Sequence, residues 1–298
     1  MIVARIFLLT LLAMIAFASN SLLCRAALKQ TNIDAATFTL IRVIAGAVAL
    51  WLVTNFAGRW IVARIARPVP ENVTISRYWL LSRGNWISAL ALFVYAAAFS
   101  FAYIDLSAGT GALLLFGAVQ ATMILWGFNK GERLNLIQIA GFAIAVSGLV
   151  VLVFPGLSAP PLIDSILMVG AGVAWGVYSL RGKGEKDPII ATTTNFFGAV
   201  PFAVALSIAS ISRTRIDFAG TTYATISGAI TSGIGYVIWY SALPGLKAAS
   251  AATVQLSVPV LAAAGGILLL GEPMTLRYLL ASIAVLGGIA LVVVTRHS

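Results

Sequence analysis

The sequence predicts an all-α integral membrane protein of ten transmembrane helices, arranged as two inverted five-helix repeats around a central cavity. Three observations lead to this fold class. Of the 298 residues, 60% are hydrophobic and 9% are charged, against about 25% charged in a soluble domain. The charged residues divide the chain into long apolar runs, and the two halves share motifs. Such a chain could not cover its surface in water, whereas lipid suits it.

Ten apolar runs approach the length of about 20 residues that a spanning helix needs. They cover residues 6–24, 35–58, 84–104, 106–129, 134–163, 165–180, 190–212, 218–246, 248–271 and 278–295. The second run contains one charge, Arg42. In the fifth run, Pro155, Pro160 and Pro161 should end the helix near Phe154, because proline cannot continue a helix.

The first run has an alternative interpretation. Arg5, an apolar stretch and Ala16-Phe17-Ala18 resemble a signal peptide with its cleavage site. The apolar residues continue to Leu23, however, and the predicted orientation requires this helix. We therefore expect it to be the first span.

Basic residues predict the orientation. With a cytoplasmic N-terminus, thirteen Lys and Arg residues fall in cytoplasmic segments and five in outer loops, among them Arg25, Lys29 and Arg277. Basic residues favour the cytoplasmic side, so both termini are predicted to lie inside, in a multi-pass protein of the bacterial inner membrane. The net charge of +10 is spread along these flanks and forms no stripe, so no nucleic-acid partner is expected.

The two halves carry matching motifs. Gly131-Glu132 follows the fourth run, and Gly271-Glu272 follows the ninth, 140 residues later. Because each half has an odd number of spans, the second half must enter the membrane the opposite way up. Inverted repeats place a binding site near the midplane between them. We predict repeats at residues 1–157 and 158–298; an old duplication that now only builds a bundle is the alternative.

Aromatic residues recur at helical spacing on three predicted helices. The third carries Tyr95, Phe99 and Tyr103, the sixth Trp175 and Tyr178, and the eighth Tyr236, Trp239 and Tyr240. Such rings suit a substrate with an apolar ring, and can hold an ammonium group over a ring face. The predicted binding rings are Tyr95, Phe99, Tyr103, Trp175, Tyr178 and Trp239. Near span ends, Trp79, Trp86 and Tyr103 also fit an interfacial belt.

Polar side chains inside the runs are further candidates. They are Asn20, Gln120, Asn195 and Gln255, of which Asn195 and Gln255 are predicted to hold a substrate head group. An interhelical hydrogen bond, worth about 0.6 kcal/mol, is the alternative role. Arg42 is also a predicted binding residue, because a charge inside a span is costly and functional by default. Its alternatives are snorkelling to the outer interface and pairing with helix-end carbonyls.

Other residues are expected to support the structure. Glu132 and Glu272 should stabilise helix N-termini through the helix dipole. Small residues spaced by four, Gly172 with Gly176 and Gly228 with Ser232, should allow close helix contact. We expect them to let the halves move against each other, with close packing alone as the alternative.

The sequence also lacks several kinds of site. No Asp, Glu or His lies in the centre of a run, as a proton relay usually requires. There is no Walker loop, and a single Cys24 and a single His297 cannot build a metal site. We therefore expect no cofactor, no metal and no enzymatic activity.

Motifs in the second half carry a family resemblance. They are Tyr240-Ser241-Ala242-Leu243, Ala248 to Gln255, Pro259, Leu270-Gly271-Glu272-Pro273 and Gly287-Gly288. They resemble the second repeat of EamA-type drug/metabolite transporters, and Phe17 to Arg25, with Arg42 and the small residues after it, is similar to the first. Within that superfamily the chain looks most like exporters of aromatic amino acids. The resemblance implies ten helices, a central cavity and peripheral fifth and tenth helices. Val119 stands where the second half has Pro259, so the resemblance does not extend to a symmetric proline hinge.

These observations together predict an alternating-access transporter that exports amino acids, aromatic and related, or similar small metabolites. Its partners would be the small-molecule substrate and the lipid bilayer, with a monomer expected, and transport would be facilitative. The alternative is an integral membrane enzyme or flippase acting on a lipid-linked substrate, whose head group the basic residues between 59 and 83 could meet.

Overall fold

A computed structural model of the chain describes residues 2–55, 85–131, 135–156, 159–182, 185, 187–246, 251 and 254–294. These residues form a bundle of helices without strands. The helices are α1 (Ile2–Gln30), α2 (Ala35–Leu52), α5 (Trp86–Ala102), α6 (Ala108–Asn129), α7 (Leu136–Val153), α8 (Leu162–Gly182), α9 (Pro188–Ala209), α10 (Phe218–Ile226), α11 (Gly235–Ala242), α13 (Ser257–Leu270) and α14 (Leu276–Val294). Single helical turns, η2 (Ile211–Arg213) and η4 (Leu243–Gly245), follow α9 and α11.

The apolar runs became helices. Eight helices of the described residues are long and apolar enough to cross a membrane, and α5 and α13 are shorter apolar helices of 17 and 14 residues. The chain is therefore a multi-pass membrane protein. The first run packs within the bundle as α1, with Ala13 and Cys24 fully buried. It extends to Gln30, so Arg25 and Lys29 lie in its last turns and not in a loop as expected.

Local sequence sets the helix ends. The Asp34 carboxylate accepts hydrogen bonds from the backbone N–H groups of Ala36 and Thr37 and begins α2. Asn135 and Gln138 form a reciprocal capping box at the start of α7. The same helix ends at Val153, ahead of the prolines, as predicted.

The glycines of the two Gly-Glu motifs share an unusual backbone conformation. Gly131 has φ +89° and Gly271 has φ +64°. This left-handed region costs side-chain-bearing residues energy and is open to glycine. Gly271 caps the C-terminus of α13 in this way. The motif is thus a helix stop, used at corresponding places in the two halves.

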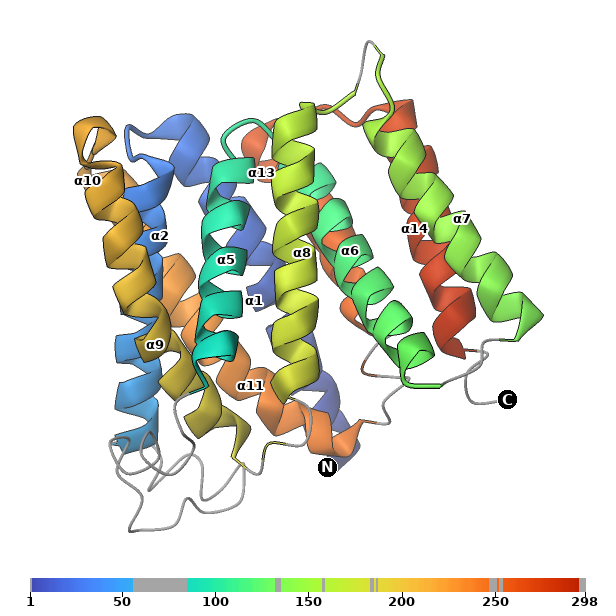
Figure 1. Cartoon of the computed structure of the whole chain (residues 1–298), viewed down its shortest axis with the longest axis horizontal. Helices are drawn as coiled ribbons and strands as arrows, with labels where there is room; N and C mark the ends of the chain where they lie inside the picture. Colours follow the sequence, from blue (N-terminus) through green and yellow to red (C-terminus); the bar gives the residue numbers. More distant parts are fainter. Residues whose placement is uncertain are drawn as a thin grey trace.

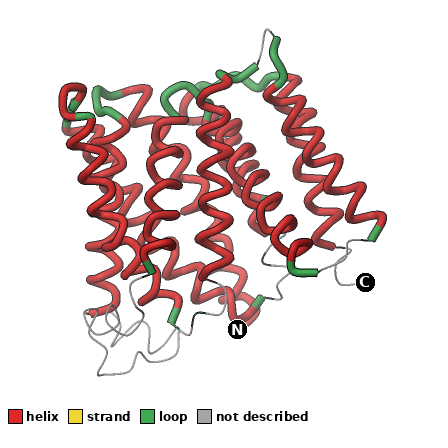
Figure 2. Tube along the Cα trace, viewed as in Figure 1, coloured by secondary structure: helices red, strands yellow, loops and turns green. Residues whose placement is uncertain are grey.

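The helices of the two halves run in opposite directions. The ends of α1, α5 and α13 and the start of α6 meet at one face, which is the upper face in Figure 1. At the opposite, lower face, Arg181 near the end of α8 contacts Asn85 and Ser88 at the start of α5. Since α1 ends at the upper face and α8 at the lower face, the first helices of the halves are inverted. Figure 2 shows the described connections at these two faces.

Helices α7 and α14, the fifth and tenth spans, pack against each other at one side of the bundle (Figure 1). Gly141 and Gly288 allow this close approach, because a Cβ on either would clash with the backbone of the other helix. The peripheral position that the family resemblance implied for these two helices matches the structure. The predicted boundary between residues 157 and 158 lies outside the described residues and stays a prediction.

The predicted small-residue contacts are also present. A Cβ on Gly172 or Gly176 would meet α6 at Ala118 or Thr122, 2.6 and 2.8 Å away. Gly228 lies directly against the backbone carbonyl of Arg42 on α2. Close packing of this kind holds apolar helices together in lipid, where the hydrophobic effect does not.

The eighth span contains a π-helix. Residues Ser227–Ile234 (η3) join α10 to α11, so that Phe218–Gly245 forms one continuous helix. The π segment is rich in small and hydroxyl residues and packs against α1 and α2. Such segments often mark functional sites, and this one lies beside the residues described next.

Candidate functional site

Seven aromatic side chains meet where the two halves touch, and we call them the central aromatic cluster. They are Phe17, Tyr95, Phe99, Trp175, Tyr178, Tyr236 and Trp239. The Tyr95 and Trp175 ring centroids are 4.6 Å apart, and those of Trp175 and Tyr236 are 5.4 Å apart. Since Tyr95 belongs to the first half and Trp175 to the second, the cluster bridges the repeats.

Arg42 lies against this cluster, deep in the bundle. It is 2% exposed, so the structure excludes the alternative of snorkelling toward the membrane surface. Its guanidinium carbon is 4.7 Å from the Phe99 ring centroid and 5.3 Å from that of Tyr95, close enough for cation–π attraction. Its Nη2 donates to the Tyr95 hydroxyl at 3.0 Å, while Nη1 is buried and has no hydrogen-bond partner among the described residues.

A buried amide connects Arg42's neighbour Tyr95 to the π-helix. Asn20 Nδ2 donates to the Tyr95 hydroxyl at 3.5 Å. Its Oδ1 accepts from the hydroxyls of Ser227 and Thr231, at 2.5 and 3.2 Å. The interhelical hydrogen bond that was the alternative role for this residue is therefore made. Asn20 holds α1, α5 and the π-helix together around the ring of Tyr95.

The other predicted binding residues divide into two groups. Trp239 is 7% exposed, and its ring is 6.2 Å from Phe17. Tyr178 contacts Thr192 at 3.4 Å and lies beside Asn195, which is buried. Gln255, by contrast, is half-buried just ahead of α13.

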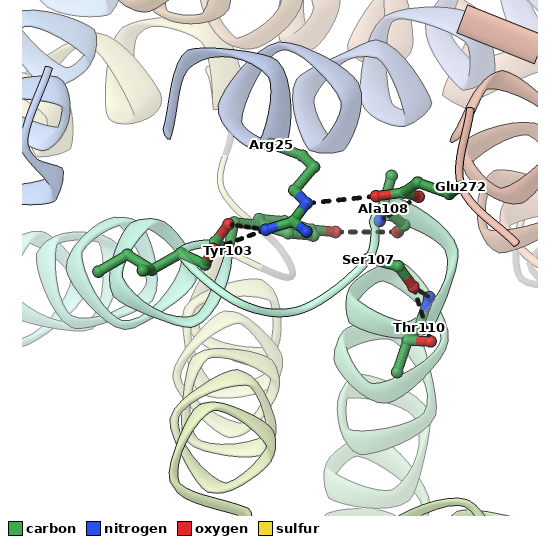
Figure 3. A network of polar contacts seen from close by, with 7 residues as sticks. Arg25, Tyr103, Ser107, Ala108, Thr110 and Glu272 are labelled. Carbon is green, nitrogen blue, oxygen red and sulfur yellow. Dashed lines mark hydrogen bonds and ion pairs between the residues drawn. The ribbon is translucent and has the colours of Figure 1, made fainter. Parts of the chain in front are cut away.

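Tyr103 belongs to a polar network at the upper face (Figure 3). It is fully buried, which excludes the interfacial belt for this ring, whereas Trp86 is 52% exposed as a belt residue would be. The Tyr103 hydroxyl donates to the Ala108 carbonyl at 3.2 Å, and its ring meets Phe99. Trp79, the third belt candidate, lies outside the described residues.

An ion pair at the centre of this network joins the two halves. Arg25 Nε lies 3.2 Å from Glu272 Oε1, and the two side chains are 8% and 12% exposed. Arg25 Nη1 also donates to the carbonyls of Tyr103 and Ile104, at 3.1 and 2.6 Å. Glu272 Oε2 accepts from the backbone N–H of Ala108 at 2.8 Å. We call these contacts the Arg25–Glu272 network.

Glu272 therefore stabilises a helix N-terminus, as predicted, but the helix is α6 of the other half and not the one that follows Glu272 in sequence. The carboxylate accepts from an N–H group that has no partner within α6, at a helix N-terminus where a negative charge is favourable. Glu132, its counterpart in the first half, lies outside the described residues.

Two cavities lined by described residues lie away from the cluster. One of about 250 Å³ borders the Arg25–Glu272 network and is lined by Asp105, Thr110, Glu272 and Tyr278 among others. A second, of about 630 Å³, is a largely apolar groove between α13 and α14. Between the halves, where the sequence predicted a central cavity, the aromatic rings contact one another in this conformation.

Several residues of this region were not evident as site residues from the sequence. Arg25 was counted as a loop residue, because the apolar run ends at Cys24. Phe17 and Tyr236 were not among the predicted binding residues, although Tyr236 shares a helix face with Trp239 and Tyr240. Ser227 and Thr231 gave a usable signal, since hydroxyls four residues apart in an apolar helix lie on one face.

Comparisons with known proteins agree with this architecture. The model of the EamA-like transporter family matches residues 163–294. An uncharacterized protein of Pseudomonas aeruginosa is 52% identical over 98% of this chain and 96% of its own length. A protein of Escherichia coli named "Probable amino-acid metabolite efflux pump" is 27% identical over 76% of this chain and 78% of its own.

Two further similarities are more distant. A "Probable terminal-alkyne amino-acid exporter" of Streptantibioticus cattleyicolor is 28% identical over 62% of this chain and 63% of its own. One crystal structure superimposes with a TM-score of 0.61 over 98% of both chains at 16% identity, which supports the fold alone.

Three observations indicate the family: the halves are inverted, a helix stop recurs at matching glycines, and relatives share this sequence across most of its length. The chain belongs to the EamA-like transporter family of drug/metabolite transporters and is a membrane transporter of small metabolites.

Proposed function

We propose that this protein exports amino acids, aromatic ones and related metabolites, from the cytoplasm across a bacterial inner membrane. The observation that carries the proposal is the central aromatic cluster, which both halves build. Ring faces attract apolar and aromatic side chains and can also hold an ammonium group. The relatives named as amino-acid exporter and efflux pump support the same substrate class.

We further propose that transport occurs by alternating access between the inverted halves. The contacts between them are of the kind that can be made and broken, namely ring pairs around Trp175 and the Arg25–Glu272 ion pair at the upper face. With both termini cytoplasmic, the upper face is the outer one, and the network closes that side. Release of substrate to the outside then requires the network to open.

Transport assays with purified protein test this proposal. Proteoliposomes loaded with labelled Phe or Trp should release it faster than protein-free vesicles, and more strongly than they release a sugar or a nucleoside. Equal release across the panel, or none above the lipid control, would contradict it.

The energy source is tested separately. We propose facilitative transport down the substrate gradient, because the apolar runs carry no central carboxylate or imidazole. Collapsing the proton gradient at a fixed substrate gradient should leave the rate unchanged, and an arrest of transport would refute this part alone.

A further inference from the structure

The guanidinium of Arg42 is a buried positive charge without a negative partner among the described residues. An arginine stays protonated in proteins, and an unpaired buried charge is costly. Two carboxylates of the described residues, Glu272 and Asp34, have other partners: Glu272 pairs with Arg25, and Asp34 caps α2 at the upper face. The compensation that Arg42 does receive comes from the faces of Phe99 and Tyr95 and from one hydroxyl.

The Arg42 guanidinium has more hydrogen-bond donors than acceptors around it among the described residues. A guanidinium has five N–H groups in a fixed fork. Tyr95 takes a hydrogen bond from Nη2, while Nη1 and its two N–H groups have no partner and are out of contact with water. A carboxylate binds such a fork through two parallel hydrogen bonds and also supplies the missing negative charge. A hydroxyl or an amide could accept a hydrogen bond from Nη1 but would supply no negative charge.

The surroundings fix the direction of such a ligand. Tyr95 contacts Arg42 with its hydroxyl and Trp175 with its ring, whose centroid is 4.6 Å away. A molecule entering between the halves would therefore meet the guanidinium at one end and ring faces at the other. Asn20 of α1 also donates a hydrogen bond to the Tyr95 hydroxyl, so the position of this tyrosine is set before any ligand arrives.

We infer that Arg42 is the carboxylate subsite of the central site, selecting substrates that carry a carboxylate at one end and an apolar group at the other. The inference rests on the proposed function and deepens it, because it names which part of the substrate is required. The substrate carboxylate pairs with Arg42 and its apolar part replaces contacts between the rings. The amides Asn195 and Gln255, predicted from sequence to hold the head group, are not needed for this charge.

A ligand panel on the purified full chain tests the subsite without any mutation. Four probes share one phenyl ring: L-phenylalanine, 3-phenylpropionate with only the carboxylate, and phenethylamine and L-phenylalaninamide without it. The two carboxylates should raise the thermal unfolding temperature in detergent. The two probes without a carboxylate should bind about tenfold or more weakly, as expected when a charge-assisted pair is lost.

Variants then assign the preference to Arg42. In Arg42→Gln, 3-phenylpropionate should bind about tenfold or more weakly, while phenethylamine is unaffected. Arg42→Lys, which keeps the charge but loses the planar fork, should be intermediate. Arg277→Gln is the matched control, because this arginine donates to the Phe154 carbonyl at the upper face, away from the cluster.

The outcomes separate this inference from the proposed function. Stabilisation by phenethylamine equal to that by 3-phenylpropionate, no stabilisation by any probe, or an unchanged carboxylate preference in Arg42→Gln would overturn the subsite. If Arg42→Gln fails to fold, the wild-type panel decides. Arg42-dependent binding of carboxylates by a protein that moves no amino acid would leave the subsite standing and refute the proposed substrate. If phenethylamine inhibits amino-acid transport as strongly as 3-phenylpropionate does, the proposed function stands and the carboxylate subsite is refuted.

Discussion

Replacing Glu272 by Gln should loosen the upper face of the bundle. The substitution keeps the size of the side chain and leaves an oxygen that can accept from Ala108. It removes the charge that pairs with Arg25 at 3.2 Å and that strengthens the bond to the α6 N-terminus. Because the network joins the two halves, its loss should favour the conformation in which they separate on this side.

The magnitude follows from the burial of the pair. Hydrogen bonds to charged groups contribute about 1.5–3 kcal/mol and neutral ones about 0.5–1.5 kcal/mol. The side chains of Arg25 and Glu272 are 8% and 12% exposed, so solvent screens them little. Neutralising Glu272 should therefore cost the closed state about 1–2 kcal/mol, which shifts the population about 5- to 30-fold toward opening.

The chain carries its own reporter for this shift. Cys24 is its single cysteine, is fully buried, and directly precedes Arg25. In right-side-out vesicles, a membrane-impermeant maleimide should label Cys24 about 5- to 30-fold faster in Glu272→Gln than in the wild type. Asp105→Asn is the matched control, because it removes an exposed carboxylate near the same face that lies outside the network.

A second variant tests whether the pair itself is responsible. Arg25→Gln should also accelerate labelling, and the double variant should be less affected than the sum of the two, because the interaction is lost only once. An unchanged labelling rate in Glu272→Gln, or one matched by Asp105→Asn, would refute the reasoning.

Three further predictions follow from the packing and the charges. Gly228→Ala places a Cβ against the α2 backbone and should destabilise the fold by about 1–3 kcal/mol. Gly170→Ala is the control, because a Cβ there meets nothing within 4 Å, and it should leave the melting temperature unchanged. Equal melting temperatures for the two variants would contradict this prediction. Trp175→Ala should weaken aromatic substrates about two- to tenfold more than aliphatic ones, measured by competition for transport; equal losses would make the ring a packing element. Burial raises the pKa of Asp34, but hydrogen bonds from side chain and backbone outweigh this and hold the pKa below its usual range. Its stabilisation is therefore present above the unfolded pKa of about 3.9 and lost as pH falls through the lower folded pKa, so Asp34→Asn should reduce the acid dependence of the melting temperature.

The positions of the spans and the end of α7 were predictable because they depend on composition and local signals, whereas α1 continues six residues beyond its apolar run, from Cys24 to Gln30. A long run free of charge is stable in the bilayer, where its backbone groups can be paired only within a helix. Prolines and cap residues act within a few positions, so the end of α7 at Val153 follows directly from the sequence. The aromatic stripes were predictable for the same reason, since helical spacing alone puts Tyr95 and Phe99 on one face.

The features that the sequence did not reveal depend on which helix faces contact one another in the folded bundle. Tyr103 fitted both a binding site and an interfacial belt, and only its packing against Phe99 and Ala108 removes it from the lipid. The partner of Arg25 lies 247 residues away, beyond any local pattern. The depth of Arg42 in its span was evident, whereas its unpaired Nη1 required knowledge of every neighbouring helix.

The π-helix at Ser227–Ile234 sets the rotational register of everything that follows it in the eighth span. A π turn inserts about one extra residue relative to an α turn, and one residue corresponds to about 100° around the helix axis. Tyr236 and Trp239 therefore face the other half because of a local insertion, and the third span, α5, has no counterpart to it among its described residues. Deleting a single residue within Ser227–Ile234 would return the helix to regular winding and turn both rings away from the cluster. The length of this segment, and not only its residues, thus determines which side chains the eighth span presents to the other half.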